Sequence, residues 1–144
     1  MKVYVSGALT GVLHVEELKK FYEDIAAVCR RLGLEPYVPH VNSDPVAHAD
    51  ISPGEVYEMD SHQVKIADLV IAYVGTPSLG VGQELEISHY EGVPLIILYE
   101  GDGRPVSRMT RGNPAVIQQI TFCDYSDALL HLQEFLQEWL AKGQ

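Results

Sequence analysis

Two short runs of almost uninterrupted apolar residues constrain the fold of this chain more than any other feature. Residues 69–74 read LVIAYV and residues 93–99 read VPLIILY. Strands buried on both faces of a parallel sheet have this composition, whereas strands of an antiparallel sheet usually alternate apolar and polar residues. The two runs therefore predict the centre of a parallel sheet that is covered by helices on both sides.

Shorter strand patterns and helical patterns alternate around these two runs. Further strands are predicted at residues 2–6, 34–38 and 117–123. Apolar residues at helical spacing predict helices over 16–32, from 53 to about 67, from the end of the 75–82 turn through 90, and over 128–140. Polar loops are expected at 40–51 and 101–112. Residues 1–144 are thus expected to form one α/β domain with a flavodoxin-like (Rossmann-like), doubly wound, five-stranded, mostly parallel sheet.

Composition limits the kinds of binding partner and the cellular compartment that we expect for this chain. A formal net charge of −10 argues against binding to nucleic-acid polymers, which requires a basic surface. Residues 1–17 make a poor signal peptide, and the apolar runs are too short to span a membrane. Cys29 and Cys123 lie in apolar runs without CxxC spacing, so we expect buried free thiols in a reducing, cytoplasmic environment.

One loop departs from the acidic character of the chain. Arg104, Arg108 and Arg111 are three of only ten basic residues. A basic loop on an acidic protein could hold one small anion, or it could be an ordinary solvated loop. The sequence leaves both interpretations open.

Ligands of doubly wound sheets bind beyond the carboxyl ends of the strands. Three loops are expected there, at residues 6–11, 75–82 and 100–111. The second contains TPSLGVGQEL at residues 76–85, in which glycines allow close approach of a ligand and Ser78 offers a hydroxyl. A tight turn with a serine N-cap would explain the same pattern.

Two carboxylates stand out as candidates for chemistry. Glu84 is expected in the first turn or so of the helix after the glycine turn, where the helix dipole would stabilise its anion and make it a plausible nucleophile. Asp60 falls on an apolar stripe with Val56, Val64 and Ala67. Such an aspartate either satisfies a buried hydrogen bond or faces a ligand, and partial burial would raise its pKa toward that of a proton donor.

Other familiar sites are not indicated. The spacing of His40, His48, Asp50 and His62 matches no set of metal ligands, so no metal is expected. Ser107 has no histidine partner in a triad-like pattern, and neither a Walker A lysine nor a GxGxxG sequence occurs. No organic cofactor is expected either.

Several segments, in order and over nearly the whole length, resemble the nucleoside 2-deoxyribosyltransferase-like superfamily, and most closely the 2′-deoxynucleoside 5′-phosphate N-hydrolases. The segments are VYVSG at 3–7, VYEMD at 56–60, ADLVIA at 67–72, PSLGVGQEL at 77–85, and the later loop with Gly103, Arg104, Ser107, Met109, Arg111 and Gly112.

The resemblance implies a role for each matching residue. Glu84 would be the nucleophile, Asp60 its catalytic partner, and Tyr4 the residue that orients the glutamate. The remaining positions would bind substrate: Gly7, Leu9 and Gly11 the base and sugar, Ser78 and Gly80 the 5′-phosphate, and Ser107 and Met109 the site of a neighbouring subunit in a homodimer. The hydrolases carry an arginine in the first loop, where this chain has Thr10.

The implied reaction is hydrolysis of the N-glycosidic bond of a (deoxy)nucleoside 5′-monophosphate through a glycosyl ester of Glu84. A deoxyribosyltransferase that exchanges bases would use the same glutamate. A non-catalytic nucleotide-sensing module on the same fold would bind a ligand without turnover. The sequence leaves these two alternatives open.

Overall fold

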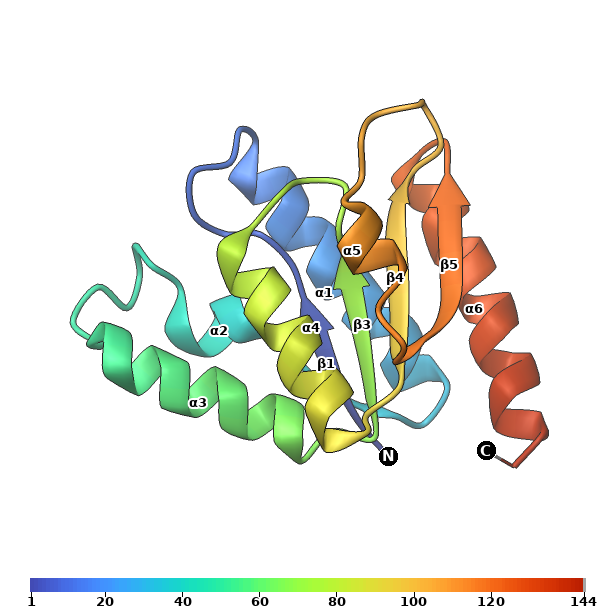
Figure 1. The fold of residues 1–144 in the computed structure, drawn as a ribbon, viewed down its shortest axis with the longest axis horizontal. Helices are drawn as coiled ribbons and strands as arrows, with labels where there is room; N and C mark the ends of the chain where they lie inside the picture. Colours follow the sequence, from blue (N-terminus) through green and yellow to red (C-terminus); the bar gives the residue numbers. More distant parts are fainter. Residues whose placement is uncertain (144) are drawn as a thin grey trace.

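The computed structural model describes residues 1–143. Its helices and strands alternate along the chain, except that α2 and α3 follow one another (Figure 1). They are β1 (Lys2–Ser6), α1 (Val15–Arg31), β2 (Glu35–Tyr37), α2 (Pro39–Ser43), α3 (Pro53–Lys65), β3 (Leu69–Tyr73), α4 (Leu79–Glu91), β4 (Leu95–Glu100), α5 (Arg108–Arg111), β5 (Val116–Phe122) and α6 (Tyr125–Ala141).

The sheet has the strand order β2-β1-β3-β4-β5, and all neighbouring strands are parallel. The flavodoxin-like prediction is therefore confirmed, with a wholly parallel sheet in place of a mostly parallel one. The chain passes from β1 outward to β2 and then returns to place β3 on the other side of β1. The order reverses between β1 and β3, and ligands of such sheets bind at the carboxyl end of this switch point.

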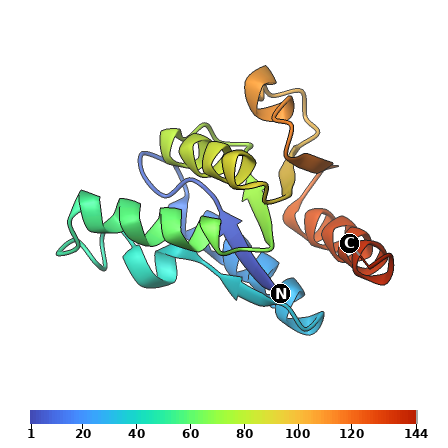
Figure 2. The ribbon, with the colours of Figure 1, turned by 60° about the horizontal axis from the view of Figure 1, so that its bottom comes forward.

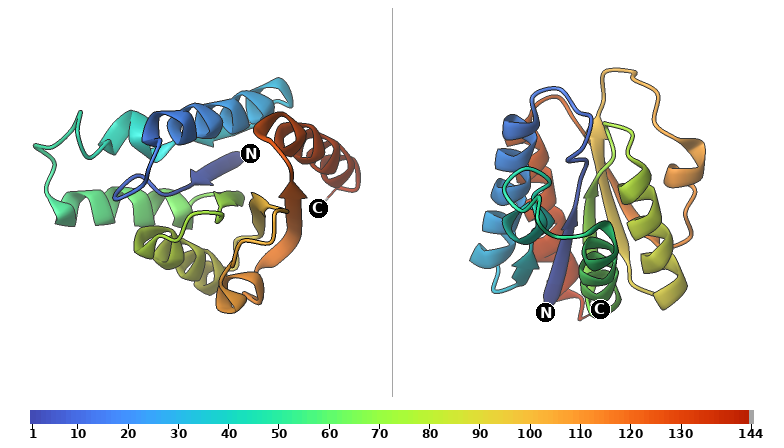
Figure 3. Two further views of the ribbon diagram at one scale, coloured as in Figure 1. Left: turned by 90° about the horizontal axis from the view of Figure 1, so that it is seen from above. Right: turned by 90° about the vertical axis from the view of Figure 1, so that its left-hand side faces the viewer.

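Helices cover both faces of the sheet, as Figure 3 shows from above. Helices α1 and α6 pack on one face, and α3 and α4 lie side by side on the other (Figure 2). Alternation along β1 divides its side chains between these layers. Val3 and Val5 join the core under α1 and α6, whereas Tyr4 joins the core under α3 and α4.

Local signals explain where three helices begin. At α3, Ser52 and Glu55 form a capping box, in which the Glu55 N–H donates to Ser52 Oγ and the Ser52 N–H donates to Glu55 Oε2. The α4 helix begins at Leu79, within the predicted turn, because Ser78 Oγ accepts from the Val81 N–H at 3.4 Å. The α6 helix begins at Tyr125, three residues before the predicted start, because Asp124 caps it.

Two predicted loops contain short helices that the sequence pattern did not indicate. In the first, Pro39 at the start of α2 supplies a helical φ angle, and Ser43 Oγ donates to the Pro39 carbonyl at 3.1 Å. In the second, Ser107 Oγ accepts from the Thr110 N–H at 3.3 Å and starts α5. Neither segment is long enough to show helical periodicity.

The prediction of two buried thiols is half wrong. Cys29 is buried, and burial raises its pKa to about 12. Cys123 is exposed at the end of β5, where its thiol donates to Asp127 Oδ2 at 3.2 Å. Within residues 1–143, no helix is both long and apolar enough to cross a membrane.

Candidate active site

Two donors from β1 hold the carboxylate of Glu84. The Tyr4 hydroxyl donates to Glu84 Oε1 at 2.8 Å, and the Ser6 hydroxyl donates to Glu84 Oε2 at 2.5 Å. Both donors are fully buried, whereas Glu84 is only partly exposed. Each carboxylate oxygen therefore accepts one hydrogen bond at the end of β1, beside the switch point of the sheet.

Sheet geometry explains why these three residues meet. Tyr4 and Ser6 are two positions apart on one strand, so their side chains point to the same face, which α4 covers. The sequence interpretation identified Tyr4 and missed Ser6. Period-two alternation from Tyr4 was the signal that could have found it.

The electrostatic surroundings of Glu84 differ from those expected from the sequence. Because α4 begins at Leu79, Glu84 lies in its second turn, and the dipole has little effect beyond the first turn. Burial and the nearby charge of Asp60 raise the pKa of Glu84 to about 7, against the hydrogen bonds from Ser6 and Tyr4, which lower it. The predicted stabilisation of the Glu84 anion by the helix dipole is thus wrong. Hydrogen bonds from Ser6 and Tyr4 stabilise the anion instead.

Tyr4 is a neutral donor in this arrangement. Burial raises its pKa well above 10, and the charges of Glu84 and Asp60 raise it further. Its ring stacks on Tyr37 of β2, with centroids 5.8 Å apart and planes 17° apart. Burial and Asp60 raise the pKa of Tyr37 to about 12. The two tyrosines form an uncharged wall beside both carboxylates.

Asp60 brings the second carboxylate to this wall from α3. Burial raises its pKa to about 6, in the direction that its apolar stripe predicted. Its Oδ1 atom is inaccessible to solvent and has no hydrogen-bond partner among residues 1–143. The sequence left two interpretations open for Asp60, a buried hydrogen bond or a place facing a ligand. The described residues supply no hydrogen bond for this oxygen. A buried, unsatisfied carboxyl oxygen is costly unless a ligand uses it.

The first loop is fixed against α1. A Cβ atom on Gly7 would lie 2.2 Å from Tyr22 Cζ, and the Tyr22 hydroxyl donates to the Ala8 carbonyl at 3.1 Å. Gly11 has a φ of 69°, which favours glycine. Leu9 is half-buried against the core, and Thr10 is exposed. The loop that contains Gly7, Leu9 and Gly11 begins directly after Ser6, and its contacts with Tyr22 hold it against α1.

Ser78 and Ser107 both line one cleft of about 320 Å³, which is formed by residues from 74–85 and 105–110. Both hydroxyls also cap helices, as described above. Gly80 is exposed on the first turn of α4, and nothing but Ser78 Oγ, at 3.9 Å, would meet a Cβ atom there. Met109 is 84% exposed on α5. The structure therefore brings the two serines together within one subunit and leaves Met109 facing outward.

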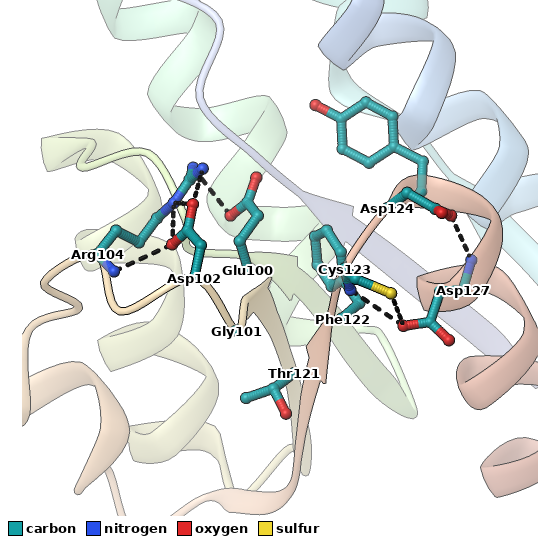
Figure 4. Close-up of a pocket in the computed structure, with 10 residues that line it drawn as sticks. Glu100, Gly101, Asp102, Arg104, Thr121, Phe122, Cys123, Asp124 and Asp127 are labelled. Atoms are coloured by element: carbon teal, nitrogen blue, oxygen red, sulfur yellow. Dashed lines mark hydrogen bonds and ion pairs between the residues drawn. The ribbon is translucent and has the colours of Figure 1, made fainter.

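The three arginines do not converge on one anion site. Arg104 contacts Asp102 Oδ2 at 2.7 Å and Glu100 Oε2 at 3.0 Å, on one wall of a cleft of about 550 Å³ at the ends of β4 and β5 (Figure 4). Cys123, Asp124 and Asp127 form the opposite wall. Arg111 lies over the Tyr99 ring, 5.8 Å from its centroid. Carboxylates already neutralise Arg104, so this wall is a poor anion site.

Comparison with solved structures defines the class of fold. The CMP N-glycosidase of Clostridium botulinum aligns with a TM-score of 0.70 and 22% identity, over 94% of this chain and 99% of that one. A 2-deoxyribosyltransferase from Bacillus psychrosaccharolyticus aligns with a TM-score of 0.65 and 22% identity, over 90% of each chain. The chain thus has the fold of the nucleoside 2-deoxyribosyltransferase-like proteins.

Sequence comparison identifies the family, although no family model matches the chain. A Syntrophotalea carbinolica protein named "Putative 2'-deoxynucleoside 5'-phosphate N-hydrolase 1" is 32% identical over 99% of this chain and 96% of its own length. The 5-hydroxymethyl-dUMP N-hydrolase of Mus musculus is 31% identical over 98% of this chain and 83% of its own length. The chain belongs to the 2′-deoxynucleoside 5′-phosphate N-hydrolase family.

Proposed function

We propose that this protein hydrolyses the N-glycosidic bond of a (deoxy)nucleoside 5′-monophosphate and releases the free base and the sugar 5-phosphate. The observation that carries the proposal is the pair of carboxylates at the switch point, Glu84 clamped by two donors and Asp60 with a buried, unsatisfied oxygen. The named N-hydrolases among its relatives support the choice of reaction.

The first half of the reaction forms a glycosyl ester. The Glu84 carboxylate attacks C1′ while the bond from C1′ to the base nitrogen breaks, and the electron pair of that bond stays on the nitrogen. The Asp60 carboxyl gives its proton to the departing base. The second half reverses these roles, as in retaining O-glycosidases. Asp60 takes a proton from water, the water oxygen bonds to C1′, and Glu84 leaves as a carboxylate.

Burial raises the pKa values of both groups toward neutral pH. The reactive form carries one proton, on Asp60, and a negative charge on Glu84, whereas the higher pKa of Glu84 places the proton of the free enzyme mostly on Glu84. The pKa values are about 6 for Asp60 and about 7 for Glu84, so the pair titrates together near neutral pH. A bound substrate changes the balance, because a cationic C1′ favours the ionised form of Glu84 and a basic leaving nitrogen favours protonated Asp60.

The Ser78 hydroxyl at the start of α4 supports a 5′-phosphate subsite on the same helix as Glu84. Gly80 would contribute a backbone N–H at the start of α4. We also propose a cytoplasmic homodimer in which Ser107 and Met109 reach the neighbouring site. The exposed apolar side chains on α4 and α5 support such an interface: Leu79 is 91% exposed, Tyr90 86% and Met109 84%.

The test is a screen of nucleoside 5′-monophosphates and matching nucleosides for base release, with each product quantified by chromatography. The proposal predicts equal amounts of free base and sugar 5-phosphate from a monophosphate. A second free base added to the same reaction tests for a transferase. The presence of exposed Thr10, where the hydrolases carry an arginine, favours that alternative. Formation of a new nucleoside at the expense of hydrolysis would make the transferase the better description. Binding of a nucleotide without any product would identify a sensing module.

A further inference from the structure

Ser6 is a buried polar side chain in the sheet core. Its exposed fraction is 0%, and its neighbours across the sheet on β3 are apolar, with Ser6 opposite Ala72 in the register. A buried hydroxyl without a partner is costly, so its hydrogen bond decides whether the residue is tolerated. The Ser6 hydroxyl donates to Glu84 Oε2.

We infer that Ser6 is a positioning residue for Glu84. Its hydroxyl holds Oε2, the carboxylate oxygen that Tyr4 does not contact. The inference rests on the proposed function for its role in catalysis, whereas the contact itself is independent of any substrate. Two residues of β1, Tyr4 and Ser6, thus orient Glu84 together, where the resemblance implied Tyr4 alone. We call these two contacts the two-point hold.

The two-point hold matters because the terminal torsion of a glutamate is soft. Rotation about the last bond is broad and roughly two-fold, so one hydrogen bond to one oxygen leaves the carboxylate plane loosely defined. Donors on both oxygens fix that plane. Each carboxylate oxygen has two lone pairs, so each keeps one lone pair available for C1′. Ser6 and Tyr4 thus orient the nucleophile without blocking it.

Charged and titratable groups from three elements face Glu84. Tyr4 on β1 donates to it, Asp60 on α3 repels its charge, and the ring of Tyr22 on α1 lies within electrostatic reach. Ser6 and Tyr4 lower the pKa of Glu84, and burial and Asp60 raise it. Removal of the Ser6 hydroxyl therefore leaves Tyr4 as the one donor against both opposing effects, and the pKa of Glu84 rises.

The experiment is a carbon NMR titration of the Glu84 carboxyl in the full-length protein without substrate, comparing wild type with Ser6→Ala and Ser6→Cys. Ser88→Ala is the matched control. Ser88 is also fully buried, lies on α4 with Glu84, and donates to the Val93 carbonyl at 2.8 Å instead. We expect the midpoint of Glu84 to move up by about one pH unit in Ser6→Ala and by less in Ser6→Cys, whose thiol is a weaker donor. The control should leave it unchanged.

The kinetic counterpart uses the same variants. Ser6 touches no substrate atom in the proposed mechanism, so Ser6→Ala should lower kcat about tenfold, keep KM within about twofold, and shift the rise of kcat/KM with pH to higher pH. An unchanged Glu84 midpoint in both Ser6 variants would overturn the inference. If Ser6→Ala does not fold, the Ser6→Cys titration decides. A shifted midpoint in a protein that cleaves no nucleotide would keep the Ser6 contact and refute the proposed function.

Discussion

Asp60 on α3 raises the pKa of Glu84 on α4, while burial raises the pKa of Asp60 itself. The two neighbouring helices thus bring two acids close together, and within residues 1–143 no basic group shifts the pKa of either one. A nearby negative charge and burial both favour the protonated form of a carboxyl group. The pair therefore holds protons at a pH where isolated carboxylates have lost them, which is what a reaction that exchanges one proton requires.

Asp60→Asn tests the electrostatic effect of Asp60 and its proposed role as a proton donor through two different readouts. Loss of the negative charge should lower the pKa of Glu84, so that kcat/KM begins to rise at lower pH. Loss of the proton donor should lower kcat by about 10²–10⁴-fold, most for substrates with poor leaving bases. The measurement is a pH–rate profile for two bases of different leaving ability. An unchanged profile with both bases would make Asp60 a structural residue.

The raised pKa of Glu84 also makes the stability of the protein depend on pH. A carboxyl group with a folded-state pKa of about 7 and an unfolded value of 4.5 binds more protons in the folded state, so stability falls as pH rises from about 4.5 through 7. Glu84→Gln removes this loss and should stabilise the protein at pH 8 by on the order of 2 kcal/mol.

Urea unfolding of wild type and Glu84→Gln at pH 5 and pH 8 measures this effect. Glu86→Gln is the matched control, because Glu86 lies on the exposed face of the same helix. The gain should appear at pH 8, shrink at pH 5, and be absent in the control. Equal unfolding free energies for wild type and Glu84→Gln at pH 8 would show that ionisation of Glu84 does not destabilise the folded protein.

The two serines of the 320 Å³ cleft should control preference for a 5′-phosphate. Each charge-assisted hydrogen bond is worth about 1.5–3 kcal/mol, so Ser78→Ala or Ser107→Ala should reduce the ratio of kcat/KM for monophosphate over nucleoside by roughly ten- to a hundredfold. Ser78→Asp is a useful companion, because aspartate preserves the helix cap and repels a phosphate. Equal ratios in wild type and all three variants would remove the phosphate from this cleft.

The proposed sharing of sites between subunits has its own test. Glu84→Ala and Ser107→Ala proteins are mixed under conditions that allow subunit exchange. If Ser107 serves the neighbouring site, some mixed dimers contain one site with both residues intact, and activity should recover to a fraction of the wild-type value. No recovery in dimers shown to have exchanged would place Ser107 in the site of its own chain, where it lines the same cleft as Ser78.

Much of this architecture could be predicted because its signals are local. The apolar runs at 69–74 and 93–99 predicted β3 and β4, and the helical pattern from residue 53 predicted the start of α3. The short helices α2 and α5 escaped prediction because four or five residues are too few to show a period. The exposure of Cys123 could not be inferred either, because it depends on where β5 ends against α6.

The site was harder to predict because its contacts are not local. Glu84 and Asp60 were singled out by their places on helices, but Ser6 meets Glu84 across 78 positions of sequence. The sequence left open whether the arginine loop holds an anion or is an ordinary solvated loop, because composition does not reveal that Asp102 and Glu100 neutralise Arg104. The environment of Glu84 was misjudged because the dipole argument depended on the first residue of α4.

The proposed mechanism requires a covalent bond between Glu84 and C1′. The most direct measurement is peptide mass spectrometry after incubation with a slow 2′-fluorinated deoxynucleoside 5′-monophosphate, with Glu84→Gln and Glu86→Gln as paired variants. We expect a glycosyl ester that carries the 5-phosphate on Glu84 in wild type and in Glu86→Gln, none in Glu84→Gln, and a fall in turnover of several orders of magnitude in that variant. Turnover of Glu84→Gln within tenfold of wild type, or an adduct on another residue, would contradict it.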